Sequence, residues 1–442
     1  MTVLIDIAYL IALIAVSPVA IYKMLRYGRY RAGWTNRFGK INRKRPDKKC
    51  IWIHAVSVGE VNATTTLIRE LESKFPDYEI VLSTTTDTGF ARANALFGNR
   101  LSVFYFPMDF SLTMHRAFAN IKPAMCLLIE LEVWPNLVRI AKQSGVPVIV
   151  VNGRLSERSF RRYNLIKGVT RKIFGNLALA LTQSEEYAER FRKLGMPAER
   201  VIVTGSVKYD TAQVADKVEG ADILAEQLFG KIDNQQSTIG NPLWVAGATG
   251  NDEEQIILDV YRRLVEQKQF ADLRLAIVPR KPERFNDVAE LIKQSGFKLT
   301  RYSKLKAATT KPTIDNRQSA IINVILGDTM GDLRKFYSLA AVIFVGRSLV
   351  PMGGSDMMEA AALGKCTIFG PHAFNFKQAV EDLLKANGAI LVKDADELFN
   401  TMKKCLTDAD YARQIAQNGR QIIRKNQGAT ARTIANISKM LK

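Results

Sequence analysis

The stretch CIWIHAVSVGE, residues 50–60, decides the fold class of this chain. Its first part, Cys50–His54, is an apolar run of strand length, and a helical pattern with its apolar residues on one face follows over Asn62–Lys74. A buried strand, a short turn and an amphipathic helix form the repeating unit of a parallel α/β sheet. The stretch therefore predicts an α/β fold with Glu60 at the carboxyl edge of a sheet.

The same alternation continues along the chain in two series of apolar runs. The first series consists of Cys50–His54, Glu79–Ser83, Leu101–Phe106, Met125–Ile129, Val146–Val151, Leu177–Leu181 and Arg200–Val203, and the second of Leu243–Gly247, Arg274–Val278, Ala320–Leu326, Ala341–Val345 and Cys366–Phe369. Residues 211–241 between them are polar and include Asn234–Ser237, a plausible hinge, and Tyr302–Arg317 resembles a surface loop. We expect two doubly wound domains, 49–215 and 242–442, joined by a linker over 216–241, with a ligand-binding cleft between the carboxyl ends of their sheets.

The composition limits the number of domains and the kinds of partner that are expected. A chain of 442 residues is long enough for two or three domains, and its formal charge of +20 attracts nucleic acid, anionic lipid or phosphorylated substrates. The charge concentrates beside an apolar N-terminal segment and no nucleic-acid-binding module is recognised, which disfavours nucleic acid as a partner. The four cysteines, Cys50, Cys126, Cys366 and Cys405, are scattered and predict ordinary reduced thiols.

The N-terminal segment Val3–Ile21 is apolar apart from Asp6 and Ser17-Pro18, and about 20 such residues span a bilayer. We predict a membrane anchor over residues 1–22, either spanning or, because Asp6 weakens that reading, monotopic. A basic segment follows over residues 23–48, and the positive-inside rule then places the rest of the chain in the cytoplasm. This segment is either a solvated linker or a patch that binds anionic lipid.

Glu60 is the candidate for chemistry in the first half. Gly59 permits a close backbone approach, and a carboxylate at the sheet edge suits a general base that acts on a hydroxyl acceptor. The alternative is a helix-start glutamate that complements the helix dipole. Position alone leaves both interpretations open.

The second half offers candidates for binding a phosphorylated ligand. The turn Gly327–Leu333 follows a strand and opens a helix, so its free N–H groups and the small Gly331 can cradle a phosphate. The turn Gly353–Glu359 has the same position, and Glu359 could bind ribose hydroxyls. Taken alone, the first motif is a weak signal because such turns are common, and the second is by default a glycine-rich turn with a capping Ser or Asp. Arg280 at a strand end suits a phosphate or carboxylate, and Lys208 lies at the domain boundary.

Metal chemistry has little support in the sequence. Asp-Ala-Asp occurs at Asp394–Asp396 and at Asp408–Asp410, but both precede helical patterns, so N-capping explains them better than metal binding. The three histidines have no metal-ligand spacing, and the sequence lacks the GxSxG, Walker A and GxGxxG motifs. We therefore predict no metal and no bound cofactor.

Taken together, these motifs resemble the bacterial 3-deoxy-manno-octulosonic acid (Kdo) transferases, which are two-domain GT-B glycosyltransferases. The matching phrases arrive in family order: Ser57–Glu60, Glu130–Asn136, Gly153–Ser156, Gly205–Asp210, Pro279–Phe285, Gly327–Leu333 and Gly370–Phe376. They cover nearly the whole chain from Cys50 onward. The resemblance implies a GT-B fold, two Rossmann-like domains facing each other across a cleft, with an N-terminal membrane-anchor helix.

The same resemblance implies the reaction and its residues. It implies metal-independent, inverting transfer of Kdo from CMP-Kdo to a hydroxyl of a phosphorylated lipid A precursor, at the cytoplasmic face of the inner membrane. Glu60 would be the general base, with Glu132, and Glu130 beside it, as acceptor-domain carboxylates and Lys208 as a cleft lysine. The CMP pocket would consist of Arg280, Met330, Gly331, Asp332 and Glu359. Inner-membrane anionic lipid would be a further partner.

Three departures from the family pattern lie on the donor side. Gly353-Gly354-Ser355-Asp356 stands where the family usually has Gly-Gly-His-Asn, which puts the carboxylate of Asp356 in the donor pocket. The segment Ala248–Glu253 differs from the family's Ser/Thr-His-x-Gly-Glu, and Arg347 replaces a common glycine and could offset the charge of Asp356. These departures leave open a related GT-B transferase that uses another nucleotide sugar. A catalytically silent GT-B-like protein that binds lipid is the other alternative.

Overall fold

The computed structural model describes residues 2–27, 31–229, 242–307 and 323–441. These residues form two compact units, the first made of Met1–Thr211 and Asn426–Lys442 and the second of Ala212–Lys425. The C-terminal segment from Asn426 therefore groups with the first unit, whereas the sequence assigned it to the second domain. Helix α20 (Ala429–Ser438) explains the difference, because its Ile434 and Ile437 are buried in the core of the first unit.

The first unit is built on a seven-stranded sheet in which all neighbouring strands are parallel. The strand order is β3-β2-β1-β4-β5-β6-β7. The strands are β1 (Lys49–His54), β2 (Tyr78–Thr84), β3 (Ser102–Tyr105), β4 (Pro123–Ile129), β5 (Val148–Gly153), β6 (Leu179–Thr182) and β7 (Val201–Val203). The order reverses direction between β1 and β4, and the loops after these two strands are where such a sheet binds ligands.

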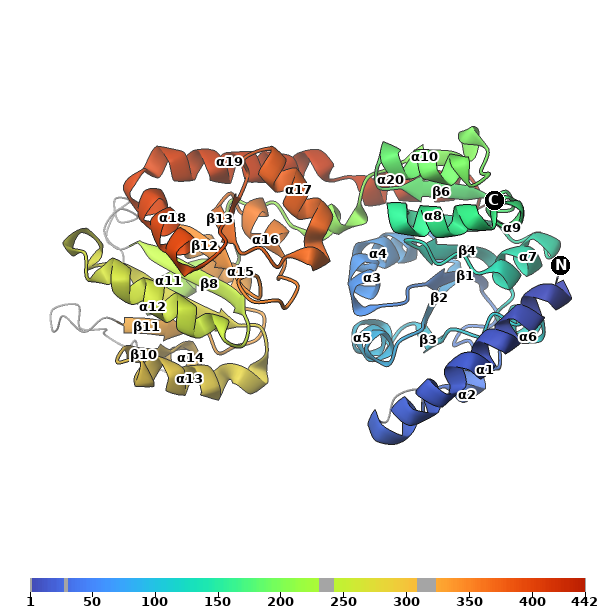
Figure 1. The fold of residues 1–442 in the computed structure, drawn as a ribbon, viewed down its shortest axis with the longest axis horizontal. Helices are drawn as coiled ribbons and strands as arrows, with labels where there is room; N and C mark the ends of the chain where they lie inside the picture. Colours follow the sequence, from blue (N-terminus) through green and yellow to red (C-terminus); the bar gives the residue numbers. More distant parts are fainter. Residues whose placement is uncertain (1, 28–30, 230–241, 308–322, 442) are drawn as a thin grey trace. The chain divides into compact units, whose positions relative to one another are not determined.

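Helices cover both faces of this sheet, as Figure 1 shows. Alternate residues of β1 feed two separate cores: Ile51 and Ile53 belong to one, and Trp52 to the other. The helices are α3 (Val58–Ala63), α4 (Thr65–Lys74), α5 (Asp87–Phe97), α6 (Ser111–Ile121), α7 (Pro135–Gln143), α8 (Glu157–Leu165), α9 (Lys167–Phe174) and α10 (Glu185–Lys193). Burial on both faces explains why the strands are continuous apolar runs.

The N-terminal helix α1 (Thr2–Tyr27) packs on the first unit through polar side chains, and the short α2 (Trp34–Arg37) follows. Asp6 accepts hydrogen bonds from the backbone N–H of Ser111 (3.0 Å) and from the Asn136 amide (2.9 Å). Tyr9 donates its hydroxyl to Asp109 at 2.9 Å. Among the residues that the structure describes, no helix is long and apolar enough to cross a membrane.

The second unit repeats the plan with a sheet of order β10-β11-β9-β8-β12-β13-β14, again parallel throughout. Its strands are β8 (Leu243–Thr249), β9 (Arg274–Pro279), β10 (Lys298–Arg301), β11 (Asn323–Leu326), β12 (Val342–Val345), β13 (Cys366–Phe369) and β14 (Ile390–Leu391). Its helices are α11 (Ala221–Phe229), α12 (Glu253–Val265), α13 (Phe285–Gln294), α14 (Tyr302–Ala307), α15 (Leu333–Leu339), α16 (Met357–Ala362), α17 (Lys377–Lys385), α18 (Ala395–Thr407) and α19 (Ala409–Asn426). The strand order reverses between β8 and β12.

Four elements differ from the sequence-based expectation. The edge strands β10 and β14 were not predicted, because β10 is largely polar and partly exposed and β14 has only two residues, within the short apolar run Ala389–Val392. Helix α11 lies in the predicted linker, where Leu224 and Leu228 bury one helix face, and α14 begins the predicted loop Tyr302–Arg317. The rest of that loop, from residue 308, and the hinge segment Asn234–Ser237 fall outside the described residues.

Asp210 holds the C-terminal helix on the first unit, and this contact yields a stability prediction. Its carboxylate accepts the backbone N–H groups of Gly428 (2.6 Å) and Thr430 (2.5 Å) at the start of α20. Asp210→Ala should destabilise the docked helix by about 1–2 kcal/mol, as the loss of a helix cap does. Amide hydrogen exchange over residues 429–438 would measure the change. Asp394→Ala, which removes the cap of α18, is the matched control and should leave that exchange unchanged; equal protection in both variants would contradict the assignment.

Candidate functional site

Backbone strain marks the carboxyl ends of the central strands in both units. Among the described residues, seven that are not glycine have positive φ, and five of these lie within the last two residues of a strand or in the loop that follows it: Glu130, Asn152, Ala248, Asp252 and Arg347. Left-handed backbone at non-glycine residues persists only where surrounding contacts enforce it, and it clusters at functional sites. The strain therefore points to the carboxyl ends of β4 and β5 in the first unit and of β8 and β12 in the second.

Glu60 occupies the start of α3, directly after β1. The Ser57 hydroxyl donates to one carboxylate oxygen at 2.9 Å, and the Val56 backbone N–H donates to the other at 2.8 Å. Ser57 in turn accepts the Glu60 backbone N–H and caps α3, while the Glu60 carboxylate accepts the N–H of Val56, the residue before the cap, which is a variant of the capping box. These contacts fix the carboxylate at the sheet edge, as the sequence predicted for Glu60, while also giving it the helix-start role that was the alternative.

Glu130 and Lys208 form an ion pair next to Glu60. Glu130 follows β4 with φ of 59°, and its carboxylate accepts a hydrogen bond from the Lys208 ammonium at 2.9 Å. Both side chains keep part of their surface exposed. Glu132 lies two residues further along the same loop and is half-buried. Three carboxylates and one ammonium thus gather at the point where the strand order of this sheet reverses.

Burial within this group raises the pKa values of Glu132 and Glu60. Burial raises the pKa of Glu132 to about 7, and the neighbouring charge of Glu60 adds to the rise. Burial also raises the pKa of Glu60, as does the charge of Glu130, whereas the hydrogen bond from Val56 and the Lys208 ammonium lower it. Carboxyl groups with raised pKa values in one cluster are suited to general acid and base chemistry.

In the second unit, Glu253 fixes the loop that carries Arg347. The buried Glu253 carboxylate accepts the backbone N–H groups of Arg347 (2.5 Å), Ser348 (2.9 Å) and Leu349 (2.9 Å). Gly346 lies so close to the neighbouring loop that an added Cβ would meet the Thr249 Cα at 2.6 Å. One carboxylate thereby joins the loops after β8 and β12 across the reversal of strand order.

Two arginines lie on the loops that follow β9 and β12. Arg280 follows β9, donates its backbone N–H to Thr249 and pairs with no carboxylate of the described residues. The Arg347 guanidinium donates to the Met352 carbonyl at 3.1 Å. Burial and the nearby charge of Arg280 lower the pKa of Arg347. Two guanidinium groups this close to each other favour an anionic ligand, which agrees with the role predicted for Arg280.

The turn with Met330, Gly331 and Asp332 lies after β11. Met330 is 66% exposed, and Gly331 has φ of 87°, a conformation that glycine adopts without strain. Asp332 is buried and forms ion pairs with Lys306 and Lys335, each at 2.8 Å, which with a hydrogen bond from Thr329 hold its pKa at about 2 despite burial. Asp332 therefore stabilises the turn, while Met330 and Gly331 form its surface.

The start of α16 brings Asp356 and Glu359 together. Asp356 accepts the Met358 backbone N–H at 2.9 Å and so caps the helix. Burial raises the pKa of Glu359 to about 6, the Asp356 charge adds to this, and Arg334 opposes it. Sequence reasoning missed Arg334 and the fully buried Tyr337, whose pKa is raised by burial and by the charge of Glu359. Their i, i+3 spacing on the helix after the Gly327–Leu333 turn is the signal that could have found them.

The Asp-Ala-Asp motifs are helix caps, as predicted. Asp394 accepts the Glu397 backbone N–H and Asp408 accepts that of Tyr411, both at 2.9 Å. Within the described ranges, no group of three or more His, Cys, Asp or Glu side chains is arranged to hold a metal ion.

The two doubly wound units, each with candidate groups at the carboxyl edge of its sheet, define a GT-B-like protein. A glycosyltransferase from Rickettsia africae has a similar structure with a TM-score of 0.54 and 14% identity, covering 90% of this chain and 99% of that one, which supports the fold alone. The profile of the family described as 3-Deoxy-D-manno-octulosonic-acid transferase (kdotransferase) matches residues 32–211.

Full-length relatives identify the family. The 3-deoxy-D-manno-octulosonic acid transferase of Haemophilus influenzae is 34% identical over 92% of this chain and 91% of its own length. That of Bordetella pertussis is 30% identical over 96% of this chain and 97% of its own. The chain belongs to the 3-deoxy-D-manno-octulosonic acid transferase family and is a glycosyltransferase, as the motifs predicted.

The proximity of Lys208 to the carboxylates predicts how Glu60 titrates. Lys208→Met removes the ammonium that lowers the pKa of Glu60 and leaves Glu130 without its partner, so the Glu60 pKa should rise. Carbon-13 NMR of the glutamate carboxyl groups over a pH series would measure the shift. Lys208→Arg keeps the positive charge and should leave the titration near that of the parent. A Glu60 pKa that is unchanged or lower in Lys208→Met would show that the ammonium does not act on it.

Proposed function

We propose that this protein transfers Kdo from CMP-Kdo to a hydroxyl of a phosphorylated lipid A precursor, with inversion at the anomeric carbon, in lipopolysaccharide biosynthesis. Membership of the Kdo transferase family supports the donor and the reaction. The observation that carries the mechanism is the group of Glu60, Glu130, Glu132 and Lys208 at the carboxyl edge of the first sheet. Neither a different nucleotide sugar nor a catalytically silent lipid-binding protein is favoured by any specific observation.

Glu60 is proposed as the general base. A carboxylate must be deprotonated to take the proton of the acceptor hydroxyl, and Lys208 favours that form by lowering the Glu60 pKa. The hydrogen bonds from Val56 and Ser57 occupy part of the carboxylate's acceptor capacity and hold its orientation. Glu132, with a pKa of about 7, is proposed to contact the acceptor.

The second unit is proposed to bind the CMP portion of the donor. Arg280 would neutralise the negative charge that develops on the leaving phosphate, since its guanidinium has no carboxylate partner among the described residues. Glu359 would accept hydrogen bonds from the ribose hydroxyls, and Met330 and Gly331 would line the pocket. The reaction needs no bound cofactor in this proposal, because the protein's own cationic groups stabilise the leaving group.

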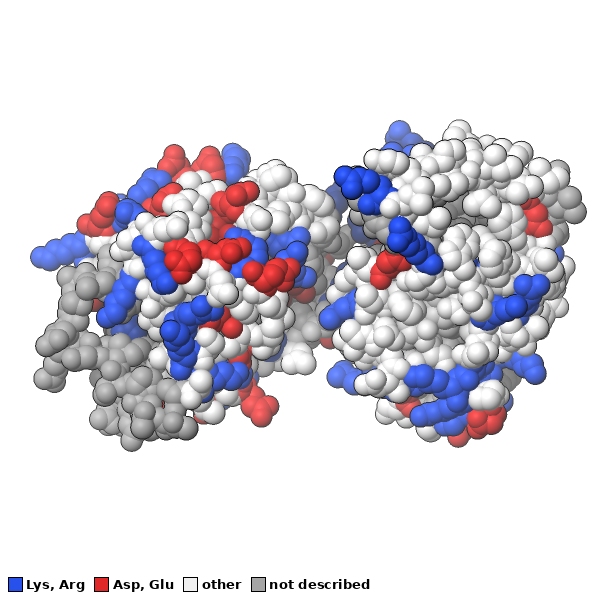
Figure 2. Space-filling view, turned by 90° about the horizontal axis from the view of Figure 1, so that it is seen from below, with Lys and Arg blue, Asp and Glu red and all other residues white. Residues whose placement is uncertain are grey.

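We further propose that helix α1 lies at the inner membrane, with both units on the cytoplasmic side. Figure 2 views the molecule from below, the side toward which α1 lies in Figure 1, and shows a broad area of the first unit with few charged side chains. Large apolar side chains of α1 are exposed: Ile7, Leu10, Ile11, Leu13, Ile14, Val16, Val19, Ile21, Tyr22 and Leu25. An exposed apolar helix followed by a basic segment suits an interfacial, monotopic attachment to anionic lipid.

The role of Glu60 is tested by Glu60→Gln. Glutamine also fits a capping box, so the fold should persist, yet an amide cannot accept the proton, and the transfer rate should fall at least about a hundredfold. Mass spectrometry of a tetraacyl lipid A precursor mixed with fresh CMP-Kdo would measure transfer, and calorimetry would measure CMP binding. Glu70→Gln on the exposed side of α4 is the matched control. Weakened CMP binding or unfolding in Glu60→Gln would remove Glu60 from the role of base.

The acidic group in the proposed donor pocket is tested by Asp356→Asn. The change removes a negative charge beside a phosphate and an acidic sugar but keeps a side-chain oxygen that caps α16, so the KM for CMP-Kdo should stay equal or fall. Steady-state kinetics with varied CMP-Kdo would measure it, with Asp394→Asn, another helix cap, as the control. A KM that rises more than about tenfold would mean that the pocket depends on this carboxylate.

A further inference from the structure

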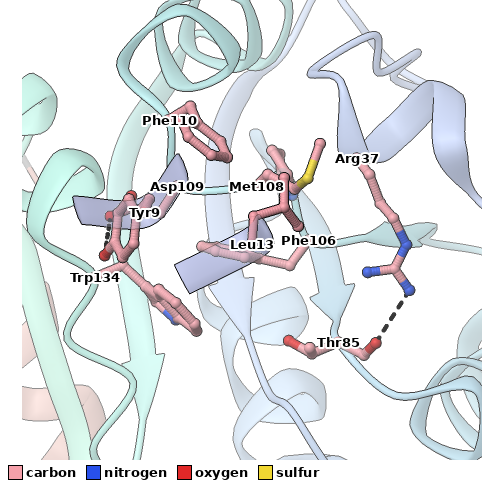
Figure 3. A pocket seen from close by; sticks show the side chains of 10 residues that line it. Tyr9, Leu13, Arg37, Thr85, Phe106, Met108, Asp109, Phe110 and Trp134 are labelled. Carbon is pink, nitrogen blue, oxygen red and sulfur yellow. Dashed lines mark hydrogen bonds between the residues drawn. The ribbon is translucent and has the colours of Figure 1, made fainter. Parts of the chain in front are cut away.

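A pocket lies between helix α1 and the body of the first unit, as Figure 3 shows. Its volume is about 240 Å³. Tyr9 and Leu13 of α1 line one side, and the segment 106–110 and Trp134 line the other. The side chains that face it are mainly apolar, including Phe106, Met108 and Phe110, which makes it suitable for an apolar ligand.

Helix α1 is fixed over this pocket by partly buried polar contacts. The Tyr9 hydroxyl donates to Asp109, and the Tyr9 ring contacts Phe110 edge-on at 5.8 Å between centroids. One turn earlier, Asp6 accepts hydrogen bonds from Ser111 and Asn136. The pocket is therefore already formed in this structure, with α1 as one wall and the body of the first unit as the other.

The pocket adjoins the carboxylate group of the proposed active site. Trp134 is two residues from Glu132, so their Cα atoms are at most about 7 Å apart. Phe106 contacts Trp134 at 5.4 Å between ring centroids and stacks on His54 at 3.9 Å. His54 ends β1, the strand that leads to the Glu60 loop. A ligand in the pocket thus lies against the residues that position both catalytic loops.

One cation borders the apolar lining. The Arg37 guanidinium lies over the Tyr105 ring at 4.6 Å and donates to the Thr85 carbonyl at 3.3 Å. Figure 3 shows it on the opposite side of the pocket from Trp134. An apolar pocket with a guanidinium at its border, beside a helix whose apolar side chains are exposed, complements a lipid that carries negative charge.

We propose that this pocket binds one acyl chain of the phosphorylated glycolipid acceptor and thereby positions its sugar at Glu60 and Glu132. The proposal rests on the proposed function and adds an acceptor subsite to it. Bulk membrane lipid also has acyl chains, but the contacts of the pocket with the two catalytic loops favour the acceptor. Burial of the acyl chain in this pocket would supply binding energy, and the bound chain would hold the reacting hydroxyl of the acceptor in a fixed orientation.

Photo-crosslinking of the full-length protein tests the site directly. The probe is a tetraacyl glycolipid acceptor with a diazirine in one acyl chain, and digested peptides are mapped by mass spectrometry. We expect adducts on α1 near Tyr9 and Leu13 and on residues 106–110, which excess unlabelled acceptor suppresses and phosphatidylglycerol does not. Equal suppression by both lipids would overturn the proposal in favour of bulk lipid, and adducts only elsewhere would overturn it outright.

A pocket-filling variant supplies the kinetic test. Leu13→Trp should raise the KM for the tetraacyl acceptor about tenfold or more, the ratio expected when a few methylene groups lose their burial, with the KM for CMP-Kdo unchanged. Leu112→Trp, at an exposed leucine on α6, is the matched control. Parent-like acceptor KM in a folded Leu13→Trp would contradict the subsite. Absence of any transfer by the parent protein would instead count against the proposed function, while the crosslinking result judges the subsite even if Leu13→Trp fails to fold.

Discussion

Each unit depends on a constraint that parallel sheets impose where their strand order reverses. At that point the chains after two adjacent strands continue to opposite faces of the sheet. This leaves a crevice between the two loops at the carboxyl edge, which no helix covers. In the second unit, the Glu253 carboxylate fixes the two loops to each other, because it accepts three consecutive backbone N–H groups from the loop after β12. In the first unit, Glu130 lies in the loop after β4, which corresponds to the loop after β12, and it is left-handed and paired with Lys208. The candidate functional residues of each unit lie on or beside these fixed loops.

Glu60 shows that structural and catalytic roles need not exclude each other. A carboxylate has about four acceptor sites, and the capping box uses two of them for Ser57 and Val56. The remaining capacity faces a region where burial and the charges of Glu130 and Lys208 set the pKa. The same hydrogen bonds that start α3 also hold the proposed base in one orientation. The two interpretations of Glu60 that the sequence left open are therefore compatible.

The sequence predicted the central strands because each is an apolar run buried on both faces. It did not predict β10, which is largely polar, or β14, which has only two residues, since both lie at a sheet edge. Nor did it predict α11, whose short sequence lies within a segment that is polar as a whole. Glu60, Glu132 and Lys208 were recognisable through motifs, but their proximity and the raised pKa of Glu132 depend on tertiary burial. Arg334 and Tyr337 escaped notice because helical spacing alone does not say what faces a site.

The structure explains why the charged residue Asp6 lies within the apolar N-terminal segment. A carboxylate within an apolar segment weakens a spanning helix, yet here it accepts hydrogen bonds from Ser111 and Asn136, over 100 residues away in the chain. Asn136 is the last residue of the Glu130–Asn136 motif. The same segment therefore carries two candidate catalytic carboxylates near its start and contacts the N-terminal helix at its end. These contacts hold the apolar surface of α1 beside the proposed acceptor site, an arrangement that suits the lipid acceptor proposed above.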